Sequence, residues 1–200
     1  MPHDIRRSKK LSWLLRHGAT ESGLAMDGAG WCEVADVLRQ TGLEPAQLED
    51  LVRTSNKQRL QLQGGRVRAC QGHSAGTPVE RAALEESWEL WTQEQSVWHG
   101  TSRAALESIA VAGLTPQTRT HVHLTESKDS TVAKRAHVEV SLEISPARTR
   151  ASGNLIYCAP NGVLLARSVP ALCIVNLYPL TKATRRDVAD LRRLLHLEPA

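Results

Sequence analysis

Apolar residues in the first quarter of the chain recur at the spacing of an amphipathic helix. In the first run, Ile5, Leu11, Leu14 and Leu15 fall near one face, and Gly18 ends the pattern. Two similar runs follow, and the second carries a proline at its first turn, where proline is well tolerated. The three predicted helices cover residues 5–18, 31–42 and 44–56.

The spacing of apolar residues then changes from helical to alternating. Leu60 and Leu62 precede Gly64-Gly65, and Val67 and Ala69 follow it, which predicts a β-hairpin. Three short helices followed by a hairpin is the order of a winged helix-turn-helix, a common nucleic-acid-binding module. The outward positions of the hairpin are polar or cationic, which suits a phosphate backbone but equally suits a solvated face. These positions are Arg59, Gln61, Gln63, Arg66 and Arg68.

Short alternating runs dominate the chain from Val97 onward. They predict strands near residues 96–101, 121–125, 137–144, 153–170 (two strands around an Asn161-Gly162 turn) and 171–180, with a helix over 102–113. The fold class is therefore α+β. The predicted organisation is a winged-helix lobe over 1–75, an acidic and helical connector over 76–96, a β-rich lobe over 97–180 and a C-terminal helix over 181–200.

Charge follows the same division. The 200 residues have a net charge of +4, yet residues 76–98 contain only one Lys or Arg against five Asp or Glu. A mild basic excess on both sides is compatible with nucleic acid. No apolar run is long enough to span a membrane and no signal peptide begins the chain, so we expect a cytoplasmic protein without membrane contacts. The four cysteines are scattered, which predicts buried thiols rather than a zinc site.

Four stretches carry unusual polar groups. Each one alone has a plain structural explanation, such as a cation at a helix end or a core histidine that bonds to a carbonyl. A metal site at the histidines lacks a carboxylate or thiol partner at suitable spacing, so we expect no metal. The stretches are Arg16-His17, Arg59, His99-Gly100-Thr101, and Arg119 with His121 and His123.

Taken in order, these stretches resemble one family, the NAD-dependent RNA 2′-phosphotransferases. The resemblance spans about residues 8–178 and rests on the words "LSWLLRHG", "GLAMDGAGW", "SNKQRLQL", "RVRACQGHS", "WHGT", "RTHVHLT" and "APNGVLL". It implies an RNA-binding winged-helix lobe and an NAD-binding lobe of the ADP-ribosyltransferase type. It also implies a reaction in which an internal RNA 2′-phosphate is transferred to NAD⁺ through an ADP-ribosylated RNA. The products are 2′-OH RNA, ADP-ribose 1″,2″-cyclic phosphate and nicotinamide.

The resemblance also implies roles for individual residues. Arg16, His17, Arg59 and Arg119 match the family's catalytic set. His99, Gly100 and Thr101 match its NAD motif, and His121 and His123 are expected beside the same cofactor. Lys57, Arg66 and Arg68 are expected to contact the RNA. The implied partners are 2′-phosphorylated RNA and NAD⁺, and we expect a monomer.

Two other functions stay open on the sequence. One is an ADP-ribosyltransferase that acts on terminal phosphates of nucleic acid. The other is a binding module without catalysis, against which the intact arginine, histidine and "WHGT" positions argue.

Overall fold

A computed structural model describes residues 2–55, 58–128 and 138–197, apart from the side chains of residues 2–5. The protein is α+β, and its contacts divide it into two compact units. The first unit comprises residues 1–89, 118–120 and 159–162, and the second comprises the remainder. The segments 118–120 and 159–162 lie within the range that the sequence assigned to the β-rich lobe, yet they pack with the first unit.

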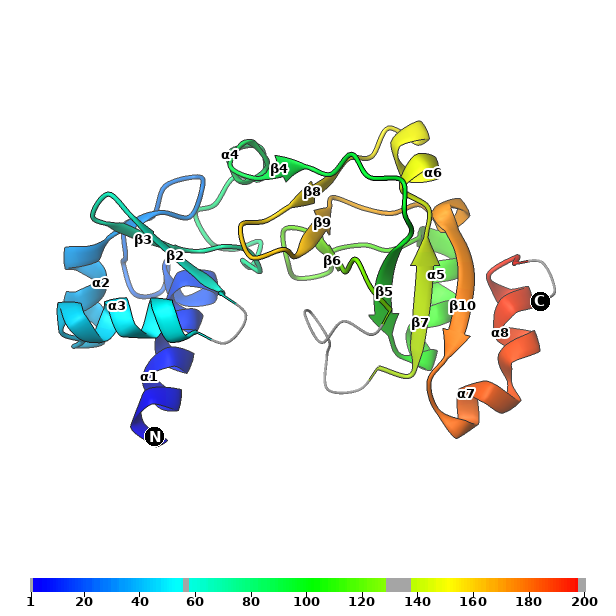
Figure 1. Ribbon diagram of the computed structural model, residues 1–200, viewed down its shortest axis with the longest axis horizontal. Helices are drawn as coiled ribbons and strands as arrows, with labels where there is room; N and C mark the ends of the chain where they lie inside the picture. The colour runs from blue at the N-terminus through cyan, green and yellow to red at the C-terminus, as the bar shows by residue number, and fades with distance from the viewer. Residues whose placement is uncertain (1, 56–57, 129–137, 198–200) are drawn as a thin grey trace. The chain divides into compact units, whose positions relative to one another are not determined.

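The first unit begins with a long helix and contains the predicted hairpin. Helix α1 (Pro2–Trp13) continues into a π-helical turn, η1 (Leu14–Gly18), and α2 (Val34–Thr41) and α3 (Pro45–Thr54) follow (Figure 1). Strands β2 (Leu60–Gln63) and β3 (Arg66–Ala69) pair antiparallel, with β1 (Cys32–Glu33) on the far side of β3. The three predicted helices and the hairpin are thereby confirmed, except that the second helix begins at Val34 and not at residue 31, because Cys32 and Glu33 pair with β3 as a short strand. Their reading as a winged helix stays a prediction.

Gly64 and Gly65 form the hairpin turn, because Gln63 pairs directly with Arg66 across it. Both glycines have positive φ, at 56° and 75°, as a two-residue turn of this kind requires. Apolar side chains of the helices and the sheet share one core, which fixes the register of the hairpin. This core includes Leu11, Leu15, Val37, Leu48, Leu60 and Val67.

The acidic connector is helical only over α4 (Arg81–Glu86), and a short strand, β4 (Glu89–Leu90), follows. Trp88 lies between the two and is buried. Its indole Nε1 donates to the carbonyl of Cys70 at 3.1 Å, so this tryptophan fastens the connector to the first unit.

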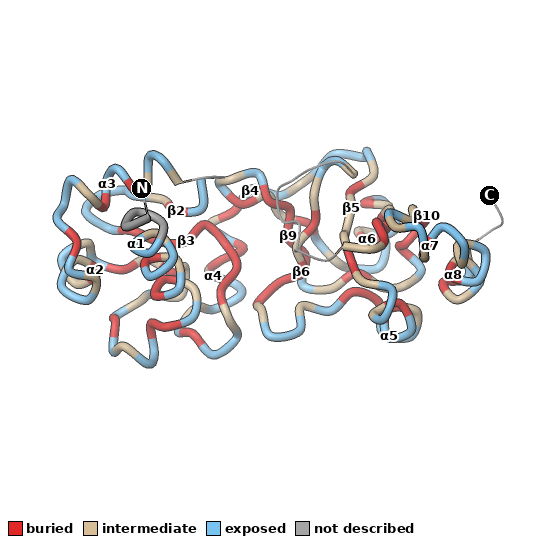
Figure 2. Tube along the Cα trace, turned by 90° about the horizontal axis from the view of Figure 1, so that it is seen from below, coloured by how far each residue is buried: buried red, intermediate tan, exposed pale blue. Residues whose placement is uncertain are grey.

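The second unit contains two sheets. One has the order β10 (Ile174–Pro179), β7 (Val140–Ile144), β5 (Val97–Thr101), and the other has the order β4, β8 (Ile156–Cys158), β9 (Leu164–Ala166), β6 (Val122–Leu124). Strands β8 and β9 flank the predicted turn at Asn161-Gly162. The inner residues of both sheets form one core with α5 and α8, and Figure 2 shows how buried and exposed stretches alternate along the chain.

Helices occupy the remaining parts of this unit. They are η2 (Arg103–Ala105), α5 (Leu106–Ala112), α6 (Pro146–Ala151), η3 (Ala171–Cys173), α7 (Lys182–Arg186) and α8 (Val188–Leu194). The C-terminal helix expected from the sequence is therefore two short helices, divided at Asp187. Leu191 and Leu195 bury the apolar side of the second one.

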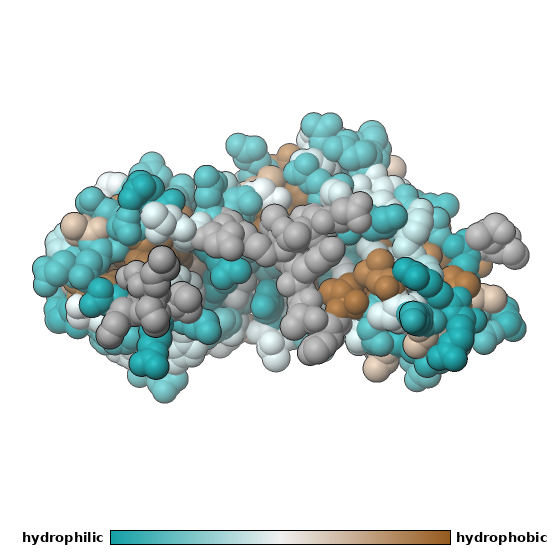
Figure 3. Space-filling model, turned by 60° about the horizontal axis from the view of Figure 1, so that its bottom comes forward, coloured by the Kyte–Doolittle hydropathy of each residue, from teal (hydrophilic) through white to brown (hydrophobic). Residues whose placement is uncertain are grey.

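On the face drawn in Figure 3, hydrophilic side chains cover most of the described surface and hydrophobic ones gather in small patches. None of the helices in the described part of the chain has the length and apolar character needed to cross a membrane.

Candidate active site

Arg16 and His17 lie on the π-helical turn η1. The turn is anchored because Leu14, Leu15 and Gly18 are buried, so Arg16 and His17 occupy its outer side, half-buried and exposed respectively. A π-turn inside a helix is uncommon and is frequent at functional sites, because the widened turn changes the direction of the side chains it carries.

The loop after β3 packs directly against this turn. The amide of Ser74 donates to the carbonyl of Arg16 at 2.9 Å, and Nδ1 of His17 lies 2.7 Å from the Ser74 hydroxyl. Gly72 has a φ of 90°, and a Cβ at this position would lie 3.6 Å from Cζ of Arg16. The loop therefore orients His17 and runs alongside the Arg16 guanidinium.

The same loop also positions Arg119. Ser74 and Arg119 form an isolated antiparallel bridge, flanked by hydrogen bonds from Ala75 N to Thr118 O and from Thr120 N to His73 O, both at 3.1 Å. Arg119 thus belongs to the first unit, although it is distant in sequence from Arg16. One short loop fixes the backbone of both residues.

Arg59 is held at the entrance to β2. Its carbonyl accepts a hydrogen bond from Cys70 N at 3.0 Å, and its side chain is exposed. The preceding residue, Gln58, has a φ of 43°, a left-handed conformation that is uncommon outside glycine. This local turn sets the direction in which the chain enters the hairpin.

The Arg16 guanidinium has a strongly lowered pKa. Burial first, and then the positive charges of Arg59 and Arg119, together lower this pKa to about 10. Its Nε and Nη2 nitrogens are shielded from solvent and have no hydrogen-bond partner among the described residues. Buried donors without acceptors are costly, so this arrangement favours an anion that would supply the missing acceptors.

His17 titrates below its ordinary range for related reasons. Partial burial lowers its pKa first, and the charges of Arg16 and Arg119 add to the effect. The imidazole is therefore largely neutral near pH 7 and can accept or donate one proton. Guanidinium groups bind phosphate oxygens in a bidentate manner, so three arginines around a neutral histidine suit a phosphate dianion and proton transfer beside it.

His99 lies in the second unit and joins its two sheets. It is on β5, and its Nδ1 is 2.9 Å from the carbonyl of His123 on β6. Because a carbonyl can only accept, Nδ1 must carry the proton, and Nε2 is the acceptor in the neutral ring. The tautomer of His99 is thereby set by the backbone of the neighbouring sheet.

The other predicted NAD residues surround this connection. A Cβ at Gly100 would lie 2.9 Å from Cγ1 of Val138, so the side chain of Val138 already occupies the space above this glycine. Thr101 is buried at the end of β5. His121 is 1% exposed and precedes β6, while His123 is half-buried within it. Their contacts with a cofactor stay predictions.

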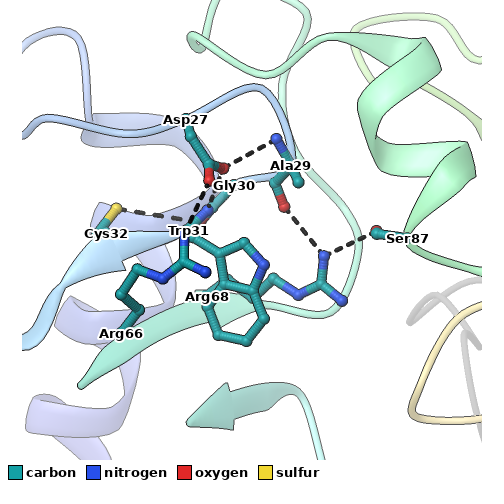
Figure 4. Close-up of polar contacts among 8 residues, drawn as sticks. All are labelled: Asp27, Ala29, Gly30, Trp31, Cys32, Arg66, Arg68 and Ser87. Atoms are coloured by element: carbon teal, nitrogen blue, oxygen red, sulfur yellow. Dashed lines mark hydrogen bonds and ion pairs between the residues drawn. The ribbon is translucent and has the colours of Figure 1, made fainter. Parts of the chain in front are cut away.

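Of the residues predicted to contact RNA, Arg68 is the most buried, at 3% exposure. Its Nη1 donates to Ala29 O and Ser87 Oγ, its Nε donates to Gln61, and its Cζ lies 4.5 Å from the centroid of Trp31 (Figure 4). A guanidinium in these contacts would have to break them to reach a phosphate. The geometry favours a structural role for Arg68.

Arg66 differs from Arg68 although both flank the same tryptophan. Its side chain is 47% exposed, its Cζ lies 5.4 Å from the Trp31 centroid, and its ion pair with Asp27 is long, at 3.4 Å (Figure 4). An exposed ion pair of this kind contributes little to stability, so Arg66 can readily leave Asp27 and bind a phosphate instead. Lys57, the third predicted RNA contact, lies outside the described residues. No group of three or more His, Cys, Asp or Glu in the described ranges could hold a metal ion.

Comparisons with known proteins identify the family of the chain. The model of the RNA 2′-phosphotransferase, Tpt1/KptA family matches residues 2–168. The chain belongs to the RNA 2′-phosphotransferase family. It is similar to proteins called "Probable RNA 2′-phosphotransferase" in Burkholderia lata (37% identity, 85% of this chain and 89% of the relative), Pyrobaculum aerophilum (36%, 85% and 80%) and Pseudomonas syringae pv. tomato (35%, 82% and 89%).

The sequence gives no role to several residues that shape this candidate site. Gly72 and Ser74 lie in the word "RVRACQGHS", yet a loop has no periodicity from which contacts can be read. The only signal for Gly72 and Ser74 is that a glycine and a serine occur in a word that the family pattern shares. Trp13, three residues before Arg16 in the word "LSWLLRHG", also has no role in the sequence prediction.

Proposed function

We propose that this protein removes an internal 2′-phosphate from RNA by transferring it to NAD⁺. The single observation that carries the proposal is the Arg16 guanidinium, with two shielded nitrogens that lack acceptors and two further arginines close enough to lower its pKa. Family membership supplies the identity of the anion, because the family is named for the RNA 2′-phosphate it transfers.

The proposed chemistry has two steps. A 2′-phosphate oxygen bonds to C1″ of the nicotinamide ribose, and nicotinamide leaves with the electron pair of the broken C–N bond. The O2″ hydroxyl then gives up its proton and bonds to the phosphorus, the bond from phosphorus to O2′ breaks, and a proton is returned to O2′ of the RNA. The products are 2′-OH RNA, ADP-ribose 1″,2″-cyclic phosphate and nicotinamide, and no metal is required.

In this scheme the arginines hold the phosphate and stabilise the negative charge that develops on its oxygens in the second step. The pKa of His17 is lowered, so the neutral imidazole is available to move a proton near neutral pH. His99, whose Nδ1 lies 2.9 Å from the carbonyl of His123, is assigned to the nicotinamide ribose. His99, Gly100, Thr101, His121 and His123 are the residues that we assign to NAD⁺.

The test is incubation of the protein with NAD⁺ and a short RNA that carries one labelled internal 2′-phosphate. We expect release of nicotinamide and transfer of the label to a cyclic phosphate product. Addition of a chelator leaves this activity unchanged if no metal takes part. ADP-ribosylation of an RNA with a terminal phosphate, without action on the internal 2′-phosphate, would favour the terminal-phosphate transferase instead. RNA binding without nicotinamide release would favour the binding module.

A further inference from the structure

Trp13 is a large apolar side chain left 44% exposed one helical turn before His17. Its neighbours Leu11, Leu14 and Leu15 are all buried, so this indole faces away from the core formed by the same helix. Single exposed apolar residues are common on protein surfaces and need no explanation alone. The residues around Trp13 suggest a reason for its exposure.

The indole is held in a fixed position. A Cβ at Gly18 would lie 2.4 Å from Cζ3, 2.5 Å from Cη2 and 2.8 Å from Cε3 of Trp13, so the six-membered ring lies directly against the backbone of Gly18. This contact joins residues five apart, which is the spacing of the π-turn that carries Arg16 and His17. An aromatic ring with one side supported by glycine and much of its area exposed is prepared to stack with little loss of side-chain entropy.

The exposed side of α1 is cationic on the N-terminal side of this ring. Arg6, Lys9 and Trp13 follow one another at intervals of three and four residues, which places them on one face of the helix, and Arg16 follows on the π-turn. Arg6 and Lys9 are exposed, like Trp13, and Lys10 lies beside them. Alternation of basic and aromatic residues is the pattern by which proteins bind single-stranded nucleic acid, with phosphates on the cations and bases on the rings.

We propose that this face of α1 binds the RNA strand next to the 2′-phosphate, and that Trp13 stacks on one nucleobase within one nucleotide of it. The inference rests on the proposed function, since Arg16 and His17 locate the phosphate from which the strand continues. The strand then runs along the helix toward its N-terminus, and Lys9 contacts a backbone phosphate. Each base has a flat face, so this contact selects single-stranded RNA without selecting its sequence.

The experiment measures binding without NAD⁺, so that no turnover occurs. The probes are a single-stranded RNA hexamer with one internal 2′-phosphate and three copies that are abasic at the phosphorylated nucleotide or at either neighbour. Stacking contributes about 1–3 kcal/mol per base, so we expect one abasic position to weaken binding to the wild type by about 5- to 150-fold. Trp13→Leu should weaken binding of the intact hexamer by a similar factor and remove the difference between the intact and abasic RNAs.

Two further variants separate stacking from charge and from folding. Trp13→Phe keeps an aromatic ring and should retain most of the affinity and the abasic effect, and far-UV circular dichroism checks that both variants are folded. Lys9→Gln should reduce the magnitude of the slope of log affinity against log salt concentration by about 0.7, while Trp13→Leu should leave this slope unchanged. Val111→Ala, an exposed apolar change on α5, serves as the control.

The outcomes distinguish this inference from the proposed function. If the wild type removes the 2′-phosphate but Trp13→Leu retains the same abasic effect, the stacking proposal is wrong and the proposed function stands. If the wild type releases neither nicotinamide nor cyclic phosphate, the proposed function fails, and the stacking proposal fails with it.

Discussion

The hydroxyl of Ser74 lies 2.7 Å from Nδ1 of His17, and the amide of Ser74 donates to the carbonyl of Arg16. Through its bridge to Arg119, the same residue fixes the backbone of a third member of the candidate site. Ser74 is therefore a positioning residue, because it orients groups that would touch the phosphate.

Replacing Ser74 by alanine should lower kcat about tenfold with a smaller effect on KM, because His17 loses the partner of Nδ1 while the backbone contacts remain. The measurement is the steady-state rate of formation of ADP-ribose 1″,2″-cyclic phosphate. Ser74→Thr, which keeps a hydroxyl, should retain more activity than Ser74→Ala. Equal activity of the two variants, or an alanine variant that changes KM alone, would contradict an orienting role.

Arg16 illustrates a conflict between stability and function. Its charge is half-buried beside two other arginines, and its unpartnered nitrogens are costly without an anion. Arg16→Met keeps the length of the side chain and should raise the free energy of unfolding by about 1 kcal/mol, with loss of activity by about a hundredfold or more. Thermal unfolding with and without inorganic phosphate checks this, and phosphate should stabilise the wild type more than the variant.

The lowered pKa of His17 predicts how the free energy of unfolding depends on pH. Burial and the nearby arginines lower this pKa in the folded protein, so the unfolded chain holds more protons on this residue between the folded value and about 6.5. Stability from this group is present above the unfolded pKa and is lost as pH falls through the folded one. His17→Asn should flatten this part of the stability profile, and a bound phosphate should raise the His17 pKa in an NMR titration. A His17 pKa above that of a model peptide in the free protein would contradict this account.

Substitutions of Arg66 and Arg68 should have different effects, although the two residues are only two positions apart on β3. Arg68→Ala should destabilise the fold by about 1–3 kcal/mol, because it removes contacts to Ala29, Ser87 and Gln61. Arg66→Ala should leave the free energy of unfolding nearly unchanged. It should reduce the magnitude of the slope of log RNA affinity against log salt concentration by about 0.7. Chemical unfolding and a salt titration of binding test the two halves separately.

The contrast between these arginines shows what the sequence could predict. Alternation correctly gave the strand and the turn at Gly64-Gly65, since both depend on neighbours in sequence. It placed Arg68 on an outward face, but that face is covered by the loop that carries Ala29 and Trp31 and by Ser87, which only the tertiary fold brings there. The same limit applies to the candidate site. Arg16 and Arg119 were found by resemblance, whereas the loop that fixes both, and the π-turn that changes the direction of Arg16, leave no periodic signal.

The two steps of the proposed reaction should place different demands on the same residues. In the first step the phosphate is the nucleophile, and excess stabilisation of its charge opposes attack. In the second step negative charge builds on the phosphoryl oxygens, so cations beside them become more effective in the transition state. Arg119 and His17 should therefore matter more for the second step than for the first, whereas His99, assigned to the nicotinamide ribose, should matter for the first.

Arg119→Ala and His17→Ala should accumulate ADP-ribosylated 2′-phosphate RNA, with second-step rates lower by about a hundredfold, the usual effect of removing one well-placed donor. His99→Ala should slow consumption of the starting RNA and accumulate nothing. A gel-resolved time course with labelled RNA distinguishes these cases, because the ADP-ribosylated strand migrates more slowly than both substrate and product. If Arg119→Ala and His17→Ala lose all turnover and never show the slower band, their bias toward the second step is wrong, and the arginine cluster acts chiefly in binding the phosphate before the first bond forms.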